Sequence, residues 1–451
     1  MQKDFGKIGF ILAALGSSIG LGHIWRFPTT AGMNGGSAFV ILFLGISLFV
    51  GVAMLIAEML IGQYGRKNVP DSFKEITQNT NTPWRFMGIT LFGGPFILTF
   101  YCAVLGWVLY YLVFVSFHLP HNFEQSKIIF DDFSSHTNMI SYQILCFITI
   151  LAMTAYSVVY GIKSIERLNY ILMPMLFIIF FGLLFYAMTM PSFKMSVEFM
   201  FKPDFSKITS NTVVEAMGQV FFSLSLGAGS ILTYASHMNK KQNLLTSAVW
   251  IVIPGIIISI VAGLMIFTFV FAYGSQSDVA RGPSLIFIVL PVMFGHLGMF
   301  GSVLCALFMV GLLFAGISST VSLLEPCIKY LNDKTHYSRA TITYAVTFGI
   351  FIVGIAVILS MNTNYQHILT FFDKNLFDWI DWMSANIILT WGSFFCSLFV
   401  GYFIPKSTLQ LWTSSYLKSS FAFHFWYYSL RTLAPLMVLV IFINRIAHLY
   451  D

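Results

Sequence analysis

Long apolar runs separated by short polar segments dominate the chain. A helix needs about 20 mainly apolar residues to cross the hydrocarbon core of a bilayer. Eleven runs approach that length, at 8–32, 38–61, 86–117, 140–160, 170–190, 213–234, 248–272, 298–324, 342–359, 379–404 and 423–443. The pattern therefore predicts an all-α integral membrane protein with about eleven transmembrane helices, folded as a single domain over residues 1–451.

The composition agrees with this pattern. Of the 451 residues, 57% are hydrophobic and 9% are charged, whereas a soluble domain is typically about 25% charged. We expect a lipid bilayer around the protein and no nucleic-acid partner. Four of the five cysteines lie inside these runs, Cys327 lies just after one, and the five form no CxxC motif, so neither a disulfide framework nor a zinc site is indicated. The sequence has no HExxH or GxSxG motif, which argues against a membrane-embedded enzyme.

The positions of Lys and Arg predict the orientation in the membrane. With the N-terminus in the cytoplasm, about two-thirds of the 24 Lys and Arg residues lie on the cytoplasmic side. The first run carries Arg26 and Pro28 and lacks a small-residue cleavage site, so we expect no removable signal peptide. The prediction is a multi-pass protein of the plasma (inner) membrane, with a cytoplasmic N-terminus and an external C-terminus.

Two of the runs carry glycine and serine at their centres. Residues 16–22 read Gly-Ser-Ser-Ile-Gly-Leu-Gly, and residues 223–229 read Ser-Leu-Ser-Leu-Gly-Ala-Gly. Glycine destabilises a helix by about 1 kcal/mol relative to alanine, and small hydroxyls compete for backbone hydrogen bonds. Both centres are therefore expected to be unwound, and unwound backbone at membrane depth must line a cavity.

The two centres lie five helices apart, which divides the chain into a first repeat at about 8–190 and a second at about 213–404. The helix at 423–443 is then additional. Interrupted helices at matching positions of two halves are typical of transporter binding sites. The simpler alternative is that the glycines only allow close helix packing, but two clusters in matching positions favour a site.

Several strings resemble signatures of the neurotransmitter:sodium symporter family. Gly20-Leu-Gly-His-Ile-Trp-Arg-Phe-Pro28, followed by Asn34-Gly-Gly36, resembles the first-helix signature of that family. The sixth-helix signature is resembled by Gly218-Gln-Val-Phe-Phe-Ser-Leu-Ser-Leu-Gly227. Ala315-Gly-Ile-Ser-Ser319 resembles the eighth-helix sodium motif, and Glu58 with Gly62-Gln-Tyr64 resembles helix two. The resemblance implies two inverted five-helix repeats, in which helices one, two, six and seven rock against a scaffold. Some bacterial members have eleven helices, as expected here.

The resemblance also implies a substrate pocket between helices one, three, six and eight. The Tyr101 hydroxyl and the Leu21 and Gly22 amides would bind the substrate carboxylate, at a half-helix N-terminus that favours anions. The substrate amine would meet the carbonyls of Ser18, Phe222 and Ser223 and the hydroxyl of Ser225. The side chain would be surrounded by Ile97, Val104, Phe222, Ala228, Ser319 and Leu323.

Two small residues indicate the substrate class. Monoamine carriers of the family have an aspartate where this chain has Gly20, so glycine favours a substrate that brings its own carboxylate. Ala228 stands where the family often has phenylalanine, which suggests a larger pocket and a large apolar or aromatic amino acid. Neighbouring side chains can refill that space, so the inference from Ala228 is the weaker of the two.

The resemblance implies one complete sodium site. Its ligands would be the carbonyls of Gly16, Ile19 and Ala315 and the hydroxyls of Ser318 and Ser319. Sodium is a hard cation and, like the divalent hard cations, prefers oxygen ligands. Paired serines on a helix often bond only to backbone, but the matching first-helix segment favours a sodium site.

A second, family-typical sodium site departs from its pattern. The two asparagine ligands correspond to His23 and Gly255, which leaves mainly Ser18, Ser223 and the substrate carboxylate. A protonated His23 would supply positive charge beside the carboxylate, and an ionisable residue at membrane depth is a functional hypothesis. The alternative is a neutral histidine bonded to a carbonyl.

Chloride stays open as a further ion. Gln219, Ser223 and Ser259 match part of the chloride set of the family, whereas Phe43 stands where that set has a tyrosine.

Three residues match the gates of the family. Arg26 and Asp381 would close the outer path through a water-bridged pair over Tyr101 and Phe222, although an arginine there can also merely snorkel. Asp333 matches the inner gate, with Lys3 as a substitute for the usual arginine partner.

These features predict sodium-coupled symport of a neutral, large hydrophobic or aromatic amino acid into the cell by alternating access. The alternative is a substrate-gated ion channel or sensor on the same scaffold, and the absence of an appended signalling domain argues against a sensor. The residues give no indication of the oligomeric state.

Overall fold

Helices form almost the whole of the computed structural model, which describes residues 5–78, 83–273 and 285–447. The first half contains α1 (Lys7–Ser18), α2 (Phe27–Met33), α3 (Ser37–Ile46), α4 (Val52–Gly65), α5 (Val69–Thr77), α6 (Thr90–Val113), α7 (Phe123–Ser135), α8 (Ile140–Val159), α9 (Ile162–Ala187) and α10 (Phe193–Phe201). The second half contains α11 (Ser210–Ser223), α12 (Ser230–Ala235), α13 (Leu244–Tyr273), α14 (Leu290–Gly295), α15 (Gly298–Lys334), α16 (Arg339–Met361), α17 (Leu376–Met383), α18 (Leu389–Leu398), α19 (Lys406–Thr413), α20 (Ser420–Tyr428) and α21 (Ala434–Ala447). Two short strands, β1 (Thr370–Phe371) and β2 (Lys374–Asn375), pair in an antiparallel hairpin.

Nine helices in the described ranges are long and apolar enough to cross a membrane. A bent pair, Lys7–Ser18 with Gly22–Met33, makes a tenth candidate. Ten of the eleven predicted runs thus coincide with such a helix or pair. The eleventh, at 213–234, is divided between α11 and α12, each too short to span alone. The all-α membrane fold is confirmed, and the count of eleven and the inverted repeats stay predictions.

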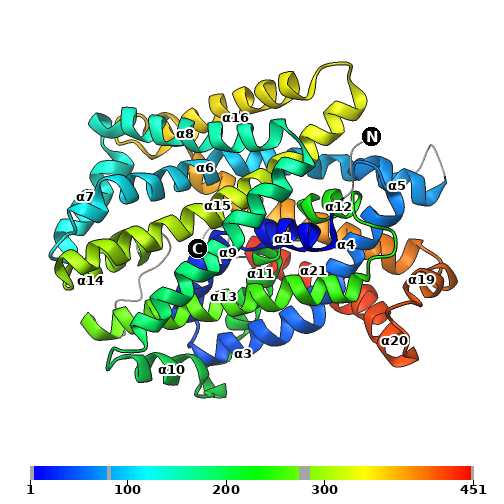
Figure 1. Ribbon diagram of the computed structural model, residues 1–451, viewed down its shortest axis with the longest axis horizontal. Coiled ribbons are helices and arrows are strands. Elements are labelled where there is room, and N and C mark those ends of the chain that lie inside the picture. Colours follow the sequence, from blue (N-terminus) through cyan, green and yellow to red (C-terminus); the bar gives the residue numbers. More distant parts are fainter. Residues whose placement is uncertain (1–4, 79–82, 274–284, 448–451) are drawn as a thin grey trace.

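The helices form a bundle around the two divided ones. Figure 1 places α1, α11 and α12 near the middle, with α6, α8 and α16 along one side and α3, α10 and α13 along the other. The packing agrees, because α6, α8 and α16 contact one another and α10 contacts both α3 and α13. The long helix α15 packs against α6, α9 and α1, so it joins the outer helices to the central ones.

Both predicted breaks lie in the middle of the bundle. Helix α1 ends at Ser18, and the chain turns through Ile19–Leu21 into the π-helical segment η1 (Gly22–Arg26), with a bend of 53°. Between α11 and α12 the backbone adopts positive φ at Ser225, Gly227 and Gly229 (50°, 80° and 74°). Glycine adopts this conformation without strain, which explains two of the glycines in the second break.

The second break is held by the side chain of Glu58 on α4. Its Oε1 accepts a hydrogen bond from the Gly227 N–H at 2.6 Å. A Cβ at Gly227 would lie 2.1 Å from the Leu389 carbonyl oxygen, so no other residue fits there without movement of α18. The carboxylate therefore satisfies a backbone amide that the broken helix leaves without an intrahelical partner.

The fifth spanning helix begins earlier than predicted. The apolar run suggested a start at Tyr170, whereas α9 begins at Ile162. Its first turns are amphipathic: Glu166 is buried and Lys163 and Arg167 are exposed. These charged residues interrupt the apolar run, so hydropathy alone did not include the first turns in the helix. Helix α9 contacts α1.

Candidate functional site

The two broken helices meet each other and α15 through serine side chains. The Ser225 hydroxyl, in the second break, donates a hydrogen bond to the Ser17 carbonyl at 2.8 Å. The Ser319 hydroxyl on α15 donates to the Gly16 carbonyl at 3.2 Å. Hydroxyls of the second break and of α15 thus bond to backbone carbonyls near the end of α1. These contacts bring the predicted site residues of the two breaks together.

Two of the three groups expected to bind a carboxylate lie side by side. The Leu21 N–H donates to the Tyr101 hydroxyl of α6 at 3.2 Å, and both residues are buried. The Gly22 carbonyl accepts from the Gln219 side chain at 2.7 Å. This bond holds η1 against α11. An N–H and a hydroxyl at a helix start form a suitable anion site.

The groups expected to bind an amine lie at helix ends. Ser18 and Ser223 are the last residues of α1 and α11, and the Phe222 carbonyl accepts from the Ser225 N–H at 3.1 Å. Carbonyls at helix C-termini carry partial negative charge, which favours a cation. The start of η1, which favours an anion, therefore lies close to the ends of α1 and α11, which favour a cation.

A cavity of about 610 Å³ opens beside these groups. Four of the predicted substrate residues line it, namely Leu21, Tyr101, Val104 and Phe222. Aromatic side chains at Trp25, Phe100 and Phe377 complete its apolar wall. Ile97, Ala228 and Leu323 are buried but do not line this cavity. The small side chain of Ala228 therefore adds no space to the cavity wall.

Gly20 lies where three structural elements converge. A Cβ built on it would be 2.5 Å from the Ser319 Oγ and 2.8 Å from the Tyr101 hydroxyl. Both distances are far shorter than van der Waals contact, so an aspartate at this position would displace Tyr101 or Ser319. The site is therefore built for a glycine here.

The residues expected to bind sodium form an oxygen-rich cluster. Ser318 Oγ donates to the Ala315 carbonyl at 2.8 Å, and Ser319 Oγ reaches the Gly16 carbonyl. Ile19, whose carbonyl is the remaining expected ligand, is fully buried directly after the end of α1. No group of three or more His, Cys, Asp or Glu that fits a metal occurs among the described residues. The donor set consists of carbonyl and hydroxyl oxygens, which fits a hard monovalent cation and not a transition metal.

One polar atom beside this cluster was missed in the sequence. The side-chain oxygen of Asn169, on α9, is buried and has no hydrogen-bond partner within the described residues. The predicted run begins at residue 170, so Asn169 lies just outside it. A single amide inside an apolar helix is the signal that would have identified it.

His23 takes the place expected for the altered sodium site. Its Nδ1 lies 2.7 Å from the Ser259 hydroxyl, and its Nε2 has no hydrogen-bond partner in the described part of the chain. A Cβ on Gly255 would be 3.0 Å from that Nε2. The imidazole ring therefore packs directly on the Gly255 backbone, and the two departures from the family pattern are neighbours.

The groups that match a chloride site are bonded within the protein. Ser259 bonds to His23, the Gln219 amide donates to Gly22, and the Ser223 hydroxyl donates to the Gln219 carbonyl. Phe43 is fully buried and packs on Phe27, with ring centroids 4.8 Å apart. It offers no hydrogen-bond donor in place of the family tyrosine.

Charged residues surround the entrance of the cavity. Arg26 and Asp381 both line it, and the Arg26 guanidinium lies 4.6 Å from the centroid of the Phe222 ring. No direct ion pair joins Arg26 to Asp381 in the described ranges, which is compatible with the expected water bridge. Glu215 on α11 also lines the cavity and pairs with Arg445 on α21 at 2.7 Å. Sequence reasoning did not anticipate this link from the last helix.

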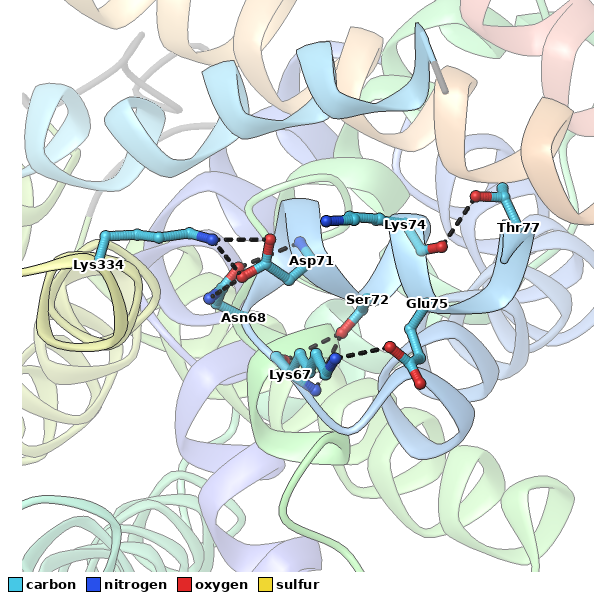
Figure 2. Close-up of polar contacts among 8 residues, drawn as sticks. All are labelled: Lys67, Asn68, Asp71, Ser72, Lys74, Glu75, Thr77 and Lys334. Carbon is cyan, nitrogen blue, oxygen red and sulfur yellow. Dashed lines mark hydrogen bonds and ion pairs between the residues drawn. The ribbon is translucent and has the colours of Figure 1, made fainter. Parts of the chain in front are cut away.

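The other end of the bundle is closed by contacts between α15 and α5. Asp333 accepts a hydrogen bond from the Asn68 side chain at 3.0 Å, and its predicted partner Lys3 lies outside the described residues. Figure 2 shows Lys334 of α15 reaching Asp71 of α5, at 2.7 Å, and the Lys67–Glu75 pair at 2.6 Å.

Asp71 is the acidic centre of this contact. Partial burial opposes its ionisation, but hydrogen bonds from Lys334 and Asn68 outweigh that effect and lower the pKa of Asp71 below its ordinary value. The carboxylate is therefore held in its charged form, so the pair with Lys334 persists at neutral pH.

Comparisons with known proteins agree with this geometry. The model of the Sodium:neurotransmitter symporter family matches residues 3–139 and 121–451. The chain is 33% identical over 448 residues to an uncharacterized sodium-dependent transporter, YhdH, of Bacillus subtilis, covering 98% of this chain and 96% of that protein. It is 25% identical over 400 residues to the sodium-dependent dopamine transporter of Bos taurus, covering 77% of this chain and 57% of that protein.

The fold has a counterpart among solved structures. The crystal structure of MhsT in complex with L-phenylalanine superposes with a TM-score of 0.86 at 32% sequence identity, covering 98% of this chain and all of that chain. The helices, their breaks and the matched sequence thus identify a multi-pass membrane protein that couples transport to sodium and is not an enzyme. The chain belongs to the sodium:neurotransmitter symporter family.

Proposed function

We propose that the protein imports a neutral, large hydrophobic or aromatic amino acid together with sodium. The observation that carries this proposal is the meeting of the Leu21 N–H and the Tyr101 hydroxyl at the wall of the cavity. A free carboxylate is the ligand that these two donors suit. The apolar wall formed by Val104, Phe222 and their aromatic neighbours suits a large side chain.

The surroundings of Gly20 support an amino acid over a monoamine. An amine without a carboxylate needs a negative group from the protein, and the space around Gly20 does not admit one. The amine of an amino acid would instead bind the carbonyls of Ser18, Phe222 and Ser223 and the Ser225 hydroxyl. The structural relative MhsT was solved with bound L-phenylalanine, which fits an aromatic substrate.

We place the cavity entrance on the external side and α5 on the cytoplasmic side. In that orientation Arg26 and Asp381 control the outer path, and Asp333 with Asn68 lies on the inner path. Sodium at Gly16, Ile19, Ala315, Ser318 and Ser319 would join α1 to α15. That link favours a conformation in which the substrate groups on both helices are correctly placed, so sodium and substrate bind cooperatively.

Uptake into proteoliposomes tests the proposal. Radiolabelled L-phenylalanine should accumulate above equilibrium when sodium is higher outside, and should not accumulate when choline replaces sodium. Excess leucine or tryptophan should compete, whereas phenethylamine, the decarboxylated analogue of phenylalanine, should not. Equal competition by phenethylamine would contradict the role of Tyr101 and Leu21.

The same vesicles separate a carrier from a channel. A carrier moves sodium and substrate in a fixed ratio, and its substrate uptake saturates. A substrate-gated channel would pass sodium without accumulating substrate, and that result would favour the alternative function.

A further inference from the structure

Asn169 is a buried amide with one end bonded and the other end free. It lies on α9 with no solvent exposure. Its Nδ2 donates to the Ile165 carbonyl one turn earlier, at 2.9 Å. Its Oδ1 has no partner among the described residues. A buried acceptor without a partner is costly, so native proteins rarely keep one without a reason.

The free oxygen faces the first break. A Cβ built on Gly16 would lie 1.9 Å from Asn169 Oδ1 and 3.0 Å from the Cβ of Ser318. The amide oxygen therefore lies against Gly16 on the side that Ser318 also approaches. Gly16 and Ser318 belong to the expected sodium cluster, and α9 packs against both α1 and α15.

We propose that Asn169 Oδ1 is a further sodium ligand, supplied by a third helix, in the cluster of Gly16, Ile19, Ala315, Ser318 and Ser319. The inference rests on the proposed sodium-coupled function and deepens it. An amide oxygen is a hard, neutral donor of the same type as the carbonyls already present. The hydrogen bond to Ile165 fixes the amide so that its oxygen, not its nitrogen, is presented to the cluster.

This assignment links the cation to the start of α1. Three residues before Asn169 on the same helix, the Glu166 carboxylate accepts from the Gly6 N–H at 3.1 Å and pairs with Lys163 at 2.5 Å. A cation held by α1, α15 and α9 would therefore fix α1 to α9 near the break, and Glu166 fixes it at the helix start. Release of sodium would remove one of these two attachments.

The test is a sodium titration of the purified protein without substrate, with the unfolding temperature as readout and choline keeping the ionic strength constant. For each variant the measured quantity is the increment that sodium adds to its own sodium-free unfolding temperature. Asn169→Ala should raise the half-saturating sodium concentration about tenfold, as expected for the loss of one bond to a charged group. Asn169→Asp, which keeps an oxygen at this place, should retain the response.

Asn386→Ala is the matched control. Asn386 is also buried and donates its amide to the carbonyl four residues earlier, that of Trp382, at 2.8 Å, but it lies outside the sodium cluster. It should leave the half-saturating concentration unchanged. If Asn169→Ala behaves like this control, Asn169 has only a structural role and the inference is overturned. If the wild-type protein itself shows no response to sodium, the sodium-coupled function fails, and the inference fails with it.

Discussion

The imidazole of His23 packs on the backbone of Gly255, with its Nε2 3.0 Å from the position that a Cβ would take there. Two positions 232 residues apart in sequence are thus complementary in size. The ring occupies the space that a side chain at 255 would need. The place where related transporters bind a first sodium is therefore expected to be filled by the histidine itself.

The first prediction follows from this packing. Wild-type protein should bind sodium with a Hill coefficient near one, because only the cluster at Gly16 and Ser318 is complete. Replacing His23 and Gly255 together by asparagine should restore a second site and raise the coefficient toward about two. Neither single substitution should restore the second site. His23→Asn leaves no side chain at 255, and Gly255→Asn clashes with the His23 ring. A coefficient of two in the wild type would contradict the prediction.

The second prediction concerns pH. If a protonated His23 neutralises the substrate carboxylate, substrate binding takes up a proton, and affinity falls as pH rises. Substrate affinity measured from pH 5.5 to 8.5 at saturating sodium should show this decline. His23→Asn should make the affinity independent of pH over the same range. A flat profile in the wild type would instead support the neutral histidine bonded to Ser259.

The third prediction tests the sodium cluster. Replacing Ser318 and Ser319 together by alanine removes both hydroxyl donors. The half-saturating sodium concentration for substrate binding should rise by about a factor of ten or more, the loss expected for bonds to a charged group. Ser322→Ala, whose hydroxyl donates to the Ser319 carbonyl at 2.8 Å on the same helix, serves as a control. Unchanged sodium dependence in the double variant would exclude the cluster.

The fourth prediction concerns the contact between α5 and α15. Hydrogen bonds from Lys334 and Asn68 lower the pKa of Asp71, so its ion pair stabilises the fold above the ordinary aspartate pKa of about 3.9. That contribution is lost as pH falls through the lowered value of the folded state. Asp71→Asn should therefore lower the unfolding temperature at pH 7, and its difference from wild type should shrink as pH falls below about 3.9.

The size of this effect should be modest, because both partners are partly exposed, with side-chain exposures of 44% for Lys334 and 23% for Asp71. We expect about 0.5 kcal/mol at pH 7. Glu75→Gln is the comparison, since its partner Lys67 is about half exposed and its loss should cost less. A difference between wild type and Asp71→Asn that keeps its full size as pH falls well below about 3.9 would show that the pair acts through packing instead of charge.

The sequence predicted the parts of this structure that depend on hydropathy and on glycine. The run at 86–117 matches the span Phe86–Phe117 at both ends, because apolar residues continue to each boundary. Both breaks were located, because clusters of glycine and serine at matching mid-membrane positions favour unwound backbone over close packing alone. The same reasoning misplaced the start of α9, where exposed Lys163 and Arg167 and buried Glu166 interrupt the apolar pattern.

The site was predictable only where a motif contributes to it. Tyr101, Leu21 and Ser319 lie together as the family resemblance implied. Asn169 and the Glu215–Arg445 pair belong to no motif, and they matter only because distant helices bring them beside other groups. Such juxtapositions depend on tertiary packing, which a linear pattern does not contain. The role expected for Ala228 in widening the pocket depended on packing in the same way.

The bond between Leu21 and Tyr101 has a consequence for how substrates are distinguished. The Leu21 N–H already donates to the Tyr101 hydroxyl, and the Ser225 hydroxyl already donates to the Ser17 carbonyl, so an arriving zwitterion would exchange existing hydrogen bonds for new ones. Such an exchange has a small net free energy, and it is the same for every amino acid. Differences in affinity must then come from apolar surface removed from water, at about 25 cal/mol per Å². On the proposed function, the polar end would select an amino acid, and the aromatic wall would select among amino acids.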